Sequence, residues 1–79
     1  MITLYINPYC GYCKKTLTTA QELGIPVTVK DKEDPGVADE VMRLGGKKQY
    51  PFMVDSDSNV TLYESGDIMA YFKAHTPKN

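Results

Sequence analysis

The sequence contains no tryptophan, a single histidine and only two cysteines among its 79 residues. Two cysteines allow at most one disulfide, whereas small secreted domains usually carry about two to four. Cys10 and Cys13 lie only three positions apart, and closing so short a loop stabilises the fold by roughly 2 kcal/mol. The pair is therefore a poor structural crosslink, which excludes the disulfide-rich class and raises the question of its role.

An excess of charge of one sign and a long apolar run are also missing. Nine basic and ten acidic residues give a net charge of −1 and an isoelectric point near 5.7, unlike a nucleic-acid-binding protein. No apolar segment approaches the ~18–20 residues that cross a bilayer, and the first residues lack the basic start of a signal peptide. We therefore expect no nucleic-acid or membrane partner and a location in the reducing cytoplasm.

The length and the hydrophobic pattern together predict one α/β domain over residues 1–79. Segments rich in β-branched and aromatic residues predict strands at residues 2–6, 27–30, 51–55 and 60–64. Apolar residues at helical spacing predict helices at about residues 11–23, from Pro35 to the Gly45–Gly46 pair, and after Ser65. The expected caps are Asp34 and Ser65 at helix starts, with Gly24 just after the first helix.

The element order β-α-β-α-β-β-α predicts the topology. Strands joined through a helix should be parallel with a right-handed crossover, and the last two, separated by a short polar turn, should form an antiparallel hairpin. The result is a four-stranded mixed sheet flanked by helices, the smallest form of the thioredoxin fold. Three residues of the second helix, Val37, Val41 and Leu44, and three of the last, Ile68, Phe72 and His75, should each share a face. The core is expected to contain Leu4, Ile6, Leu17, Val27, Val41, Met53 and Phe72.

The Cys-Gly-Tyr-Cys segment at residues 10–13 falls where the first strand turns into the first helix. Residues three apart on a helix have Cβ atoms about 5–6 Å apart, so a small adjustment allows a disulfide. The helix N-terminus favours the Cys10 thiolate, and Lys14 and Lys15 add positive charge in the next turn. We predict that Cys10 is the nucleophile, with a lowered pKa, and that Cys13 is a covered resolving thiol with a higher pKa.

Three roles compete for the cysteine pair: a structural disulfide, a zinc site and a redox dithiol. A structural zinc site needs four ligands, and the only imidazole is His75, near the C-terminus. A Cys-x-x-Cys motif beside a βαβ pattern is a redox signature in a reducing compartment. We therefore favour the redox dithiol and expect no metal.

Two further segments bear on the site. Tyr50-Pro51 opens the third strand, and its bond is either an ordinary trans bond at a strand start or a cis bond, as in about 5–6% of X–Pro bonds; composition does not choose between them. Ser65, Gly66 and Asp67 begin the last helix. Free N–H groups there bind a carboxylate, and Asp67 can pair with an amine.

The chain resembles the glutaredoxins in three motifs and in their order and spacing: residues 10–13, Tyr50-Pro51 and residues 65–67. The resemblance covers roughly residues 2–75. It implies a thioredoxin fold of the minimal glutaredoxin form, glutathione-dependent thiol–disulfide exchange, and a cis bond at Pro51. It further implies that the Tyr50 backbone pairs with the cysteine of glutathione. The other implied glutathione contacts are Ser65, Gly66 and Asp67 at its γ-glutamyl end, Lys47, Lys48 or Gln49 at its glycine carboxylate, and Tyr12 beside it.

The chain departs from the family pattern at Gly11, where proline is common, and at Asn7, where lysine is frequent. Gly11 is shared with single-cysteine glutaredoxins, many of which bridge a [2Fe–2S] cluster, so a cluster carrier is one alternative. Another is a dithiol electron donor, for example to ribonucleotide reductase, reduced by thioredoxin reductase. The Glu-Ser-Gly-Asp-Ile stretch also resembles the N-terminal domain of glutathione transferases, whose helical second domain we do not expect in 79 residues.

The predicted reaction is nucleophilic catalysis through a mixed disulfide. Cys10 attacks a glutathionylated protein, takes up the glutathione, and is regenerated by a second glutathione. On a protein disulfide, Cys13 resolves the intermediate and leaves Cys10 and Cys13 oxidised. The expected partners of this monomer are glutathione, as co-substrate, and disulfide-containing or glutathionylated proteins.

Overall fold

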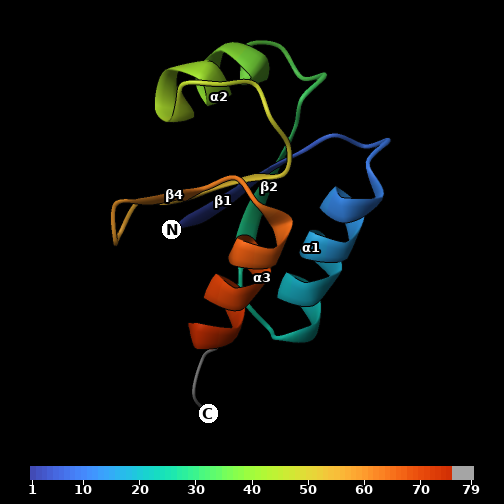
Figure 1. The fold of residues 1–79 in the computed structure, drawn as a ribbon, viewed down its shortest axis with the longest axis vertical. Helices are drawn as coiled ribbons and strands as arrows, with labels where there is room; N and C mark the ends of the chain where they lie inside the picture. The colour runs from blue at the N-terminus through green and yellow to red at the C-terminus, as the bar shows by residue number, and fades with distance from the viewer. Residues whose placement is uncertain (76–79) are drawn as a thin grey trace.

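The computed structural model describes residues 1–75 of the chain. In this part the element order is the predicted β-α-β-α-β-β-α (Figure 1). The strands are β1 (Ile2–Ile6), β2 (Val27–Asp31), β3 (Phe52–Asp55) and β4 (Val60–Leu62). The helices are α1 (Gly11–Glu22), α2 (Val37–Gly45) and α3 (Ser65–Ala74).

The strands form one mixed sheet in the order β2-β1-β3-β4. β1 runs parallel to β2 and antiparallel to β3, and β3 pairs antiparallel with β4. α1 and α3 lie side by side, apart from α2 (Figure 1). The sheet topology confirms the predicted thioredoxin fold. It places the end of β1, which leads to α1, beside the start of β3 and the end of β4.

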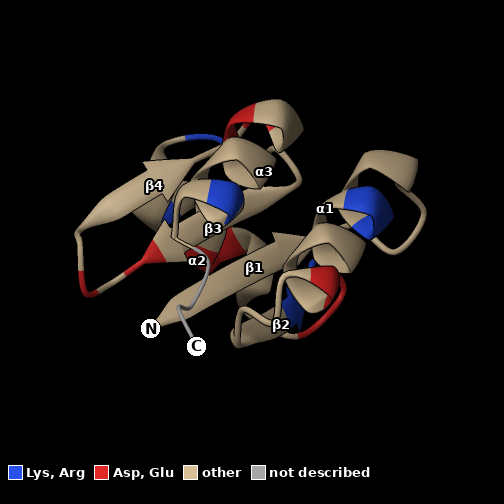
Figure 2. Cartoon of the chain, turned by 90° about the horizontal axis from the view of Figure 1, so that it is seen from below, with Lys and Arg blue, Asp and Glu red and all other residues tan. Residues whose placement is uncertain are grey.

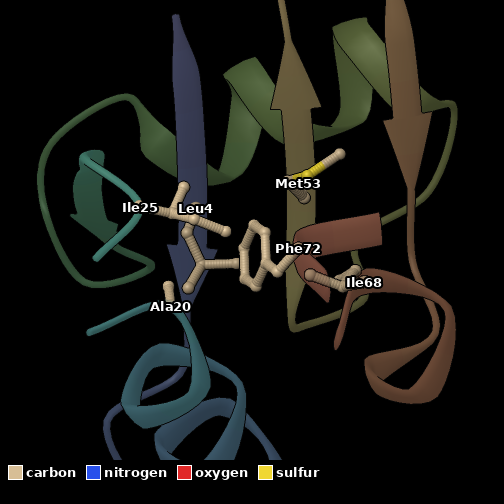
Figure 3. Packing of buried hydrophobic residues seen from close by; sticks show 6 residues of the cluster. All are labelled: Leu4, Ala20, Ile25, Met53, Ile68 and Phe72. Carbon is tan, nitrogen blue, oxygen red and sulfur yellow. The ribbon is translucent and has the colours of Figure 1, made fainter. Parts of the chain in front are cut away.

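The two faces of the sheet bury two separate hydrophobic clusters, because successive side chains of a strand point to opposite faces. Leu4 and Met53 pack against α1 and α3 in the larger cluster, where the Phe72 ring lies beside Leu4 (Figure 3). Tyr5 and Phe52 face α2 on the other side. The larger cluster consists of Leu4, Ala20, Ile25, Met53, Ile68 and Phe72, and the smaller one of Tyr5, Val37, Val41 and Phe52.

The core is close to the predicted one. Among the residues expected there, four are fully buried, namely Leu4, Val41, Met53 and Phe72. The other three, Ile6, Leu17 and Val27, are half-buried and pack against the larger cluster.

The start of α2 differs from the prediction. Its N-cap is Gly36, with φ 80°, and not Asp34, so Pro35 lies before the helix. The Asp34 carboxylate accepts a hydrogen bond from the Asp31 N–H (3.3 Å), and the Asp34 carbonyl accepts one from the Val37 N–H (3.2 Å). Asp34 thus closes a turn before the helix, and the left-handed glycine redirects the chain into it.

Leu44 was expected on the buried face of α2, but its side chain is 43% exposed. The helix ends one residue later at Gly45, and Gly46 follows it with φ 88°. The Tyr63 ring, and not Leu44, lies against this end of α2, at Gly45. The predicted stop at Gly45–Gly46 is therefore confirmed, while the extent of the apolar face was overestimated.

The ends of α3 also differ by one residue. Glu64 is the N-cap, and Ser65 is the first helical residue. His75 is the C-cap and is exposed, outside the buried face formed by Ile68 and Phe72. Its ring stacks on Tyr71, with centroids 3.9 Å apart, so it covers the end of the helix.

Candidate active site

The turn between β1 and α1 is built by Asn7. The Asn7 carbonyl accepts a hydrogen bond from the Cys10 N–H (3.0 Å), and its side-chain oxygen accepts one from the Tyr9 N–H (3.0 Å). Short polar side chains commonly stabilise turns in this way. Cys10 is thereby placed at the N-cap of α1 in an extended conformation, with its side chain half-buried.

The position of Cys10 favours its thiolate. The backbone N–H of Cys13, together with the Cys13 thiol and the Tyr12 N–H, lowers the pKa of Cys10, against an opposing effect of burial. Donors at a helix N-terminus stabilise a negative charge in this way. The direction agrees with the one expected from the sequence.

Cys13 has the opposite environment. Its side chain is 1% exposed, on the buried side of α1, and burial raises its pKa to about 11. The Asn7 N–H donates a hydrogen bond to its sulfur (3.4 Å) and opposes this effect only in part. Both cysteines are free thiols. The motif therefore pairs one accessible, acidic thiol with one covered, weakly acidic thiol.

A groove of about 390 Å³ opens beside this motif. It joins three segments that are far apart in the sequence: the start of α1, the entry to β3 and the junction of β4 with α3. Its lining residues are Tyr12, Gln49, Tyr50, Pro51, Tyr63, Glu64 and Ser65. The three motifs found in the sequence thus meet around one concave surface.

The wall at β3 is shaped by a cis peptide bond between Tyr50 and Pro51, as the family resemblance implied. Pro51 is buried, and Tyr50 is half-buried. Within residues 1–75, the buried Tyr50 hydroxyl has no hydrogen-bond partner.

Most of the predicted glutathione-binding residues lie at the groove, but not all of them line it. Five do so: Tyr12, Gln49, Tyr50, Pro51 and Ser65. Four others are exposed beside it: Lys47 and Lys48 precede Gln49, and Gly66 and Asp67 follow Ser65 in the first turn of α3. The structure thus brings the predicted positions to one side of the molecule.

Two lining residues, Tyr63 and Glu64, are absent from the sequence prediction. Glu64 is exposed and caps α3, so its carboxylate stands at the groove, where it can pair with an amine. The position of Glu64 next to Ser65 could have predicted that it lines the groove. The position of Tyr63 could not have been predicted in this way, because it depends on contacts with α2.

The N-terminal turns of the two helices that begin at the groove carry side chains of opposite charge. α1 carries Lys14 and Lys15 just after the cysteine motif, whereas the first turn of α3 carries Asp67 (Figure 2). A ligand that bears both a carboxylate and an amine is the kind that such a distribution can orient.

Among residues 1–75, no group of three or more His, Cys, Asp or Glu side chains is placed to hold a metal ion. None of the helices there is both long and apolar enough to span a bilayer.

The sequence was compared with protein families and with curated proteins. Residues 4–79 match the family described as Glutathione S-transferase, N-terminal domain. No curated protein matches the chain.

Solved structures of glutathione transferases share the fold. Glutathione S-transferase unclassified 2 from Bombyx mori superposes with a TM-score of 0.81 at 23% identity, covering 99% of this chain and 37% of that protein. A delta-class glutathione transferase from Nilaparvata lugens gives 0.80 at 26% identity, covering 100% and 38%. Glutathione transferase Omega 3C from Trametes versicolor gives 0.80 at 22% identity, covering 96% and 35%. The chain thus spans less than two-fifths of the length of these three proteins.

Proposed function

The chain belongs to the glutathione S-transferase N-terminal domain family, and from this membership we propose that its groove binds glutathione for thiol–disulfide exchange at Cys10. The proposal combines two kinds of support. The family and the groove support glutathione as the ligand, and the cysteine motif supports disulfide chemistry. The finer likeness to glutaredoxins remains a prediction from the motifs.

The observation that carries the proposal is the asymmetry of the two thiols. Cys10 is half-buried with a lowered pKa, and Cys13 is buried with a pKa raised to about 11. A thiol with a lowered pKa supplies thiolate near neutral pH, where a thiolate attacks disulfides. A covered partner three residues away can resolve a mixed disulfide but does not compete for the incoming substrate.

The groove offers matching groups for each part of glutathione. The Tyr50 backbone would pair with its cysteine, next to Tyr12 and the cysteine motif. Its γ-glutamyl carboxylate would lie at the start of α3, near Ser65, with its amine toward Glu64 and Asp67. Gln49 and the neighbouring lysines would hold its glycine carboxylate.

The proposed reaction takes place in two exchanges. The Cys10 thiolate attacks the glutathione sulfur of a glutathionylated protein, and the protein leaves as a thiolate that takes a proton from water. A second glutathione thiolate then attacks the mixed disulfide at Cys10, which restores the Cys10 thiolate and releases glutathione disulfide. On a protein disulfide, the Cys10 thiolate first forms a mixed disulfide with one protein sulfur and releases the other as a thiolate. Cys13, as it loses its proton, attacks the Cys10 sulfur of that mixed disulfide, which releases the second protein thiolate and forms the Cys10–Cys13 disulfide. Two glutathione molecules then reduce this disulfide and leave as glutathione disulfide.

The test is glutathione-dependent reduction of a mixed disulfide, coupled to glutathione reductase. The Cys10→Ser variant should lose the activity, because no thiolate remains at the N-cap of α1. The Cys13→Ser variant should keep the reduction of glutathionylated substrate and lose the reduction of protein disulfides. Full activity of Cys10→Ser would overturn the proposal.

A second candidate, transfer of glutathione to an electrophile, is favoured by the family itself. Here glutathione would be the nucleophile, and Cys10 would not form a covalent intermediate. Conjugation of an aryl chloride in the presence of glutathione tests it directly. Conjugation that survives in Cys10→Ser, together with no mixed-disulfide reduction by the native chain, would favour the transferase.

A further inference from the structure

Tyr63 has a position that neither the sequence motifs nor the proposed chemistry explains. It follows β4 and precedes the N-cap of α3, and it lines the groove. Its ring stacks on Phe52 of β3, with centroids 4.5 Å apart. The side chain therefore reaches from one wall of the groove toward the other.

The hydroxyl of Tyr63 fastens the segment that leads to the β3 wall. It donates a hydrogen bond to the Lys47 carbonyl (2.7 Å) and accepts one from the Lys47 N–H (3.3 Å). The Lys47 ammonium also lies 4.7 Å from the centre of the Tyr63 ring. One side chain thus fixes both the backbone and the side chain of Lys47.

The end of α2 is shaped to admit this ring. Gly45 has no side chain, and a Cβ atom there would overlap the Tyr63 hydroxyl and lie 2.6 Å from its Cζ. Such an approach is closer than a real Cβ contact allows, so either the ring or the helix end would have to move. Gly45 and Tyr63 therefore form one interlocking contact.

We propose that Tyr63 is a positioning residue that holds segment 46–50 at a fixed distance from the start of α3 and so sets the affinity of the groove for glutathione. The inference rests on the proposed glutathione site. Lys47, Lys48, Gln49 and Tyr50 belong to this segment, and Ser65 follows Tyr63 by two residues. The two walls that would hold opposite ends of the tripeptide are joined through this one side chain.

The contact acts on binding and not on the thiol. Cys10 owes its lowered pKa to groups within residues 10–13. The hydrogen bonds of the Tyr63 hydroxyl are made with Lys47 and not with these groups. Loosening segment 46–50 should therefore weaken ligand binding, because the segment must then be ordered when the ligand arrives. The reactivity of Cys10 should not change.

The test uses Tyr63→Phe, which removes both hydrogen bonds to Lys47 and keeps the ring on Phe52. The ligand is S-methylglutathione, which cannot exchange with Cys10, and binding is followed by NMR titration of the full chain. The loss of these hydrogen bonds should raise the Kd about threefold or more. The KM for a glutathionylated substrate should rise in parallel, while kcat and the pH profile of Cys10 alkylation stay unchanged.

Tyr71→Phe is the matched control. The Tyr71 hydroxyl also donates a short hydrogen bond, to the Asp55 carboxylate (2.5 Å), but Tyr71 does not line the groove. Its removal should lower stability and leave the Kd for S-methylglutathione unchanged. Equal weakening of binding in both variants would assign the effect to general destabilisation and overturn the proposal.

Gly45→Ala tests the same contact from outside the groove. The added methyl would overlap the Tyr63 hydroxyl, so the ring or the end of α2 must move and the contact is lost. The Kd should therefore rise as in Tyr63→Phe, although Gly45 does not line the groove. An unchanged Kd in Tyr63→Phe overturns the inference while leaving the glutathione site intact. Absence of S-methylglutathione binding by the native chain contradicts the glutathione site itself, so the two failures are distinguishable.

Discussion

Cys10 and Cys13 carry the same functional group, and their surroundings alone separate their chemistry. Cys10 lies at the N-terminus of α1 among backbone N–H donors, whereas Cys13, three residues later, lies on the buried side of the same helix. The same turn of helix therefore holds one accessible thiol with a lowered pKa and one buried thiol with a raised pKa. Asn7 supports both, through its carbonyl to the Cys10 N–H and its own N–H to the Cys13 sulfur.

This difference predicts a two-step pH dependence of alkylation by iodoacetamide. Cys10 should react with a midpoint below that of an ordinary thiol, because its folded pKa is lowered. Cys13 should stay unmodified until the pH approaches its pKa of about 11. Mass spectrometry of the native chain at a series of pH values, with Cys13→Ser as control, measures both. Modification of Cys13 before Cys10 would contradict this account.

At the scale of elements, polar contacts add to the smaller hydrophobic cluster in holding α2 against the sheet. Glu40 accepts hydrogen bonds from the Tyr5 hydroxyl and the Lys30 ammonium, and both hold the pKa of its carboxyl below the usual range. The Lys30 Nζ lies 3.0 Å from the Glu40 carboxylate. These bonds join α2 to β1 and β2, while Gly45 and Tyr63 join its other end to β4.

The left-handed residue that ends α2 makes a test at this scale. Gly46 has φ 88°, and nothing lies within 4 Å of a Cβ placed there, so Gly46→Ala adds backbone strain without a steric overlap. We expect a loss of about 1–2 kcal/mol in the free energy of unfolding. Urea unfolding followed by circular dichroism measures it.

Gly66→Ala is the control for this prediction. Gly66 lies in ordinary helical backbone, also with open space around its Cα. Alanine is favoured there because it has the higher helix propensity, so the unfolding free energy should not fall. Equal losses at both positions would show that the strain at Gly46 is not the cause.

At the scale of the whole molecule, Asp55 of β3 connects the sheet to the N-terminus and to α3. It is only 7% exposed, accepts the Tyr71 hydroxyl hydrogen bond from α3 (2.5 Å), and lies 3.8 Å from the Met1 ammonium. The Tyr71 hydrogen bond is the main cause of a lowered pKa at Asp55, with a further contribution from the Asp57 N–H. A buried carboxylate is stable here because it is fully paired.

The lowered pKa of Asp55 predicts acid sensitivity. A depressed folded pKa contributes stability above the unfolded value of about 3.9, and this contribution is lost as the pH falls through the folded value. Asp55→Asn should therefore cost about 1–3 kcal/mol at pH 7 and flatten the pH dependence below about pH 4. Urea unfolding from pH 2 to pH 7 measures both effects, and exposed Glu22→Gln should change neither.

Local signals were sufficient to predict the fold and the position of the two cysteines at the start of α1. Strand and helix periods predicted the element order, and Gly24 and Gly46 marked helix ends because their φ angles of 72° and 88° suit glycine. Cys10 at a strand-to-helix turn predicted the direction of its pKa. The caps at Asp34 and Ser65 were misplaced because a side chain can serve a neighbouring turn or begin the helix as well as cap it.

The sequence by itself determined the order of the elements and the place of Cys10 at the start of α1, since both follow from patterns within a few residues. The burial of Cys13, which is the main cause of its raised pKa, depends on the packing of α1 in the tertiary structure. Only the tertiary structure decided how the start of α1, the cis Tyr50-Pro51 bond and the start of α3 surround one groove. The contacts of Tyr63 with Phe52, Lys47 and Gly45 likewise join residues that no periodicity relates. Such contacts form only when the sheet brings β3, β4 and the end of α2 together.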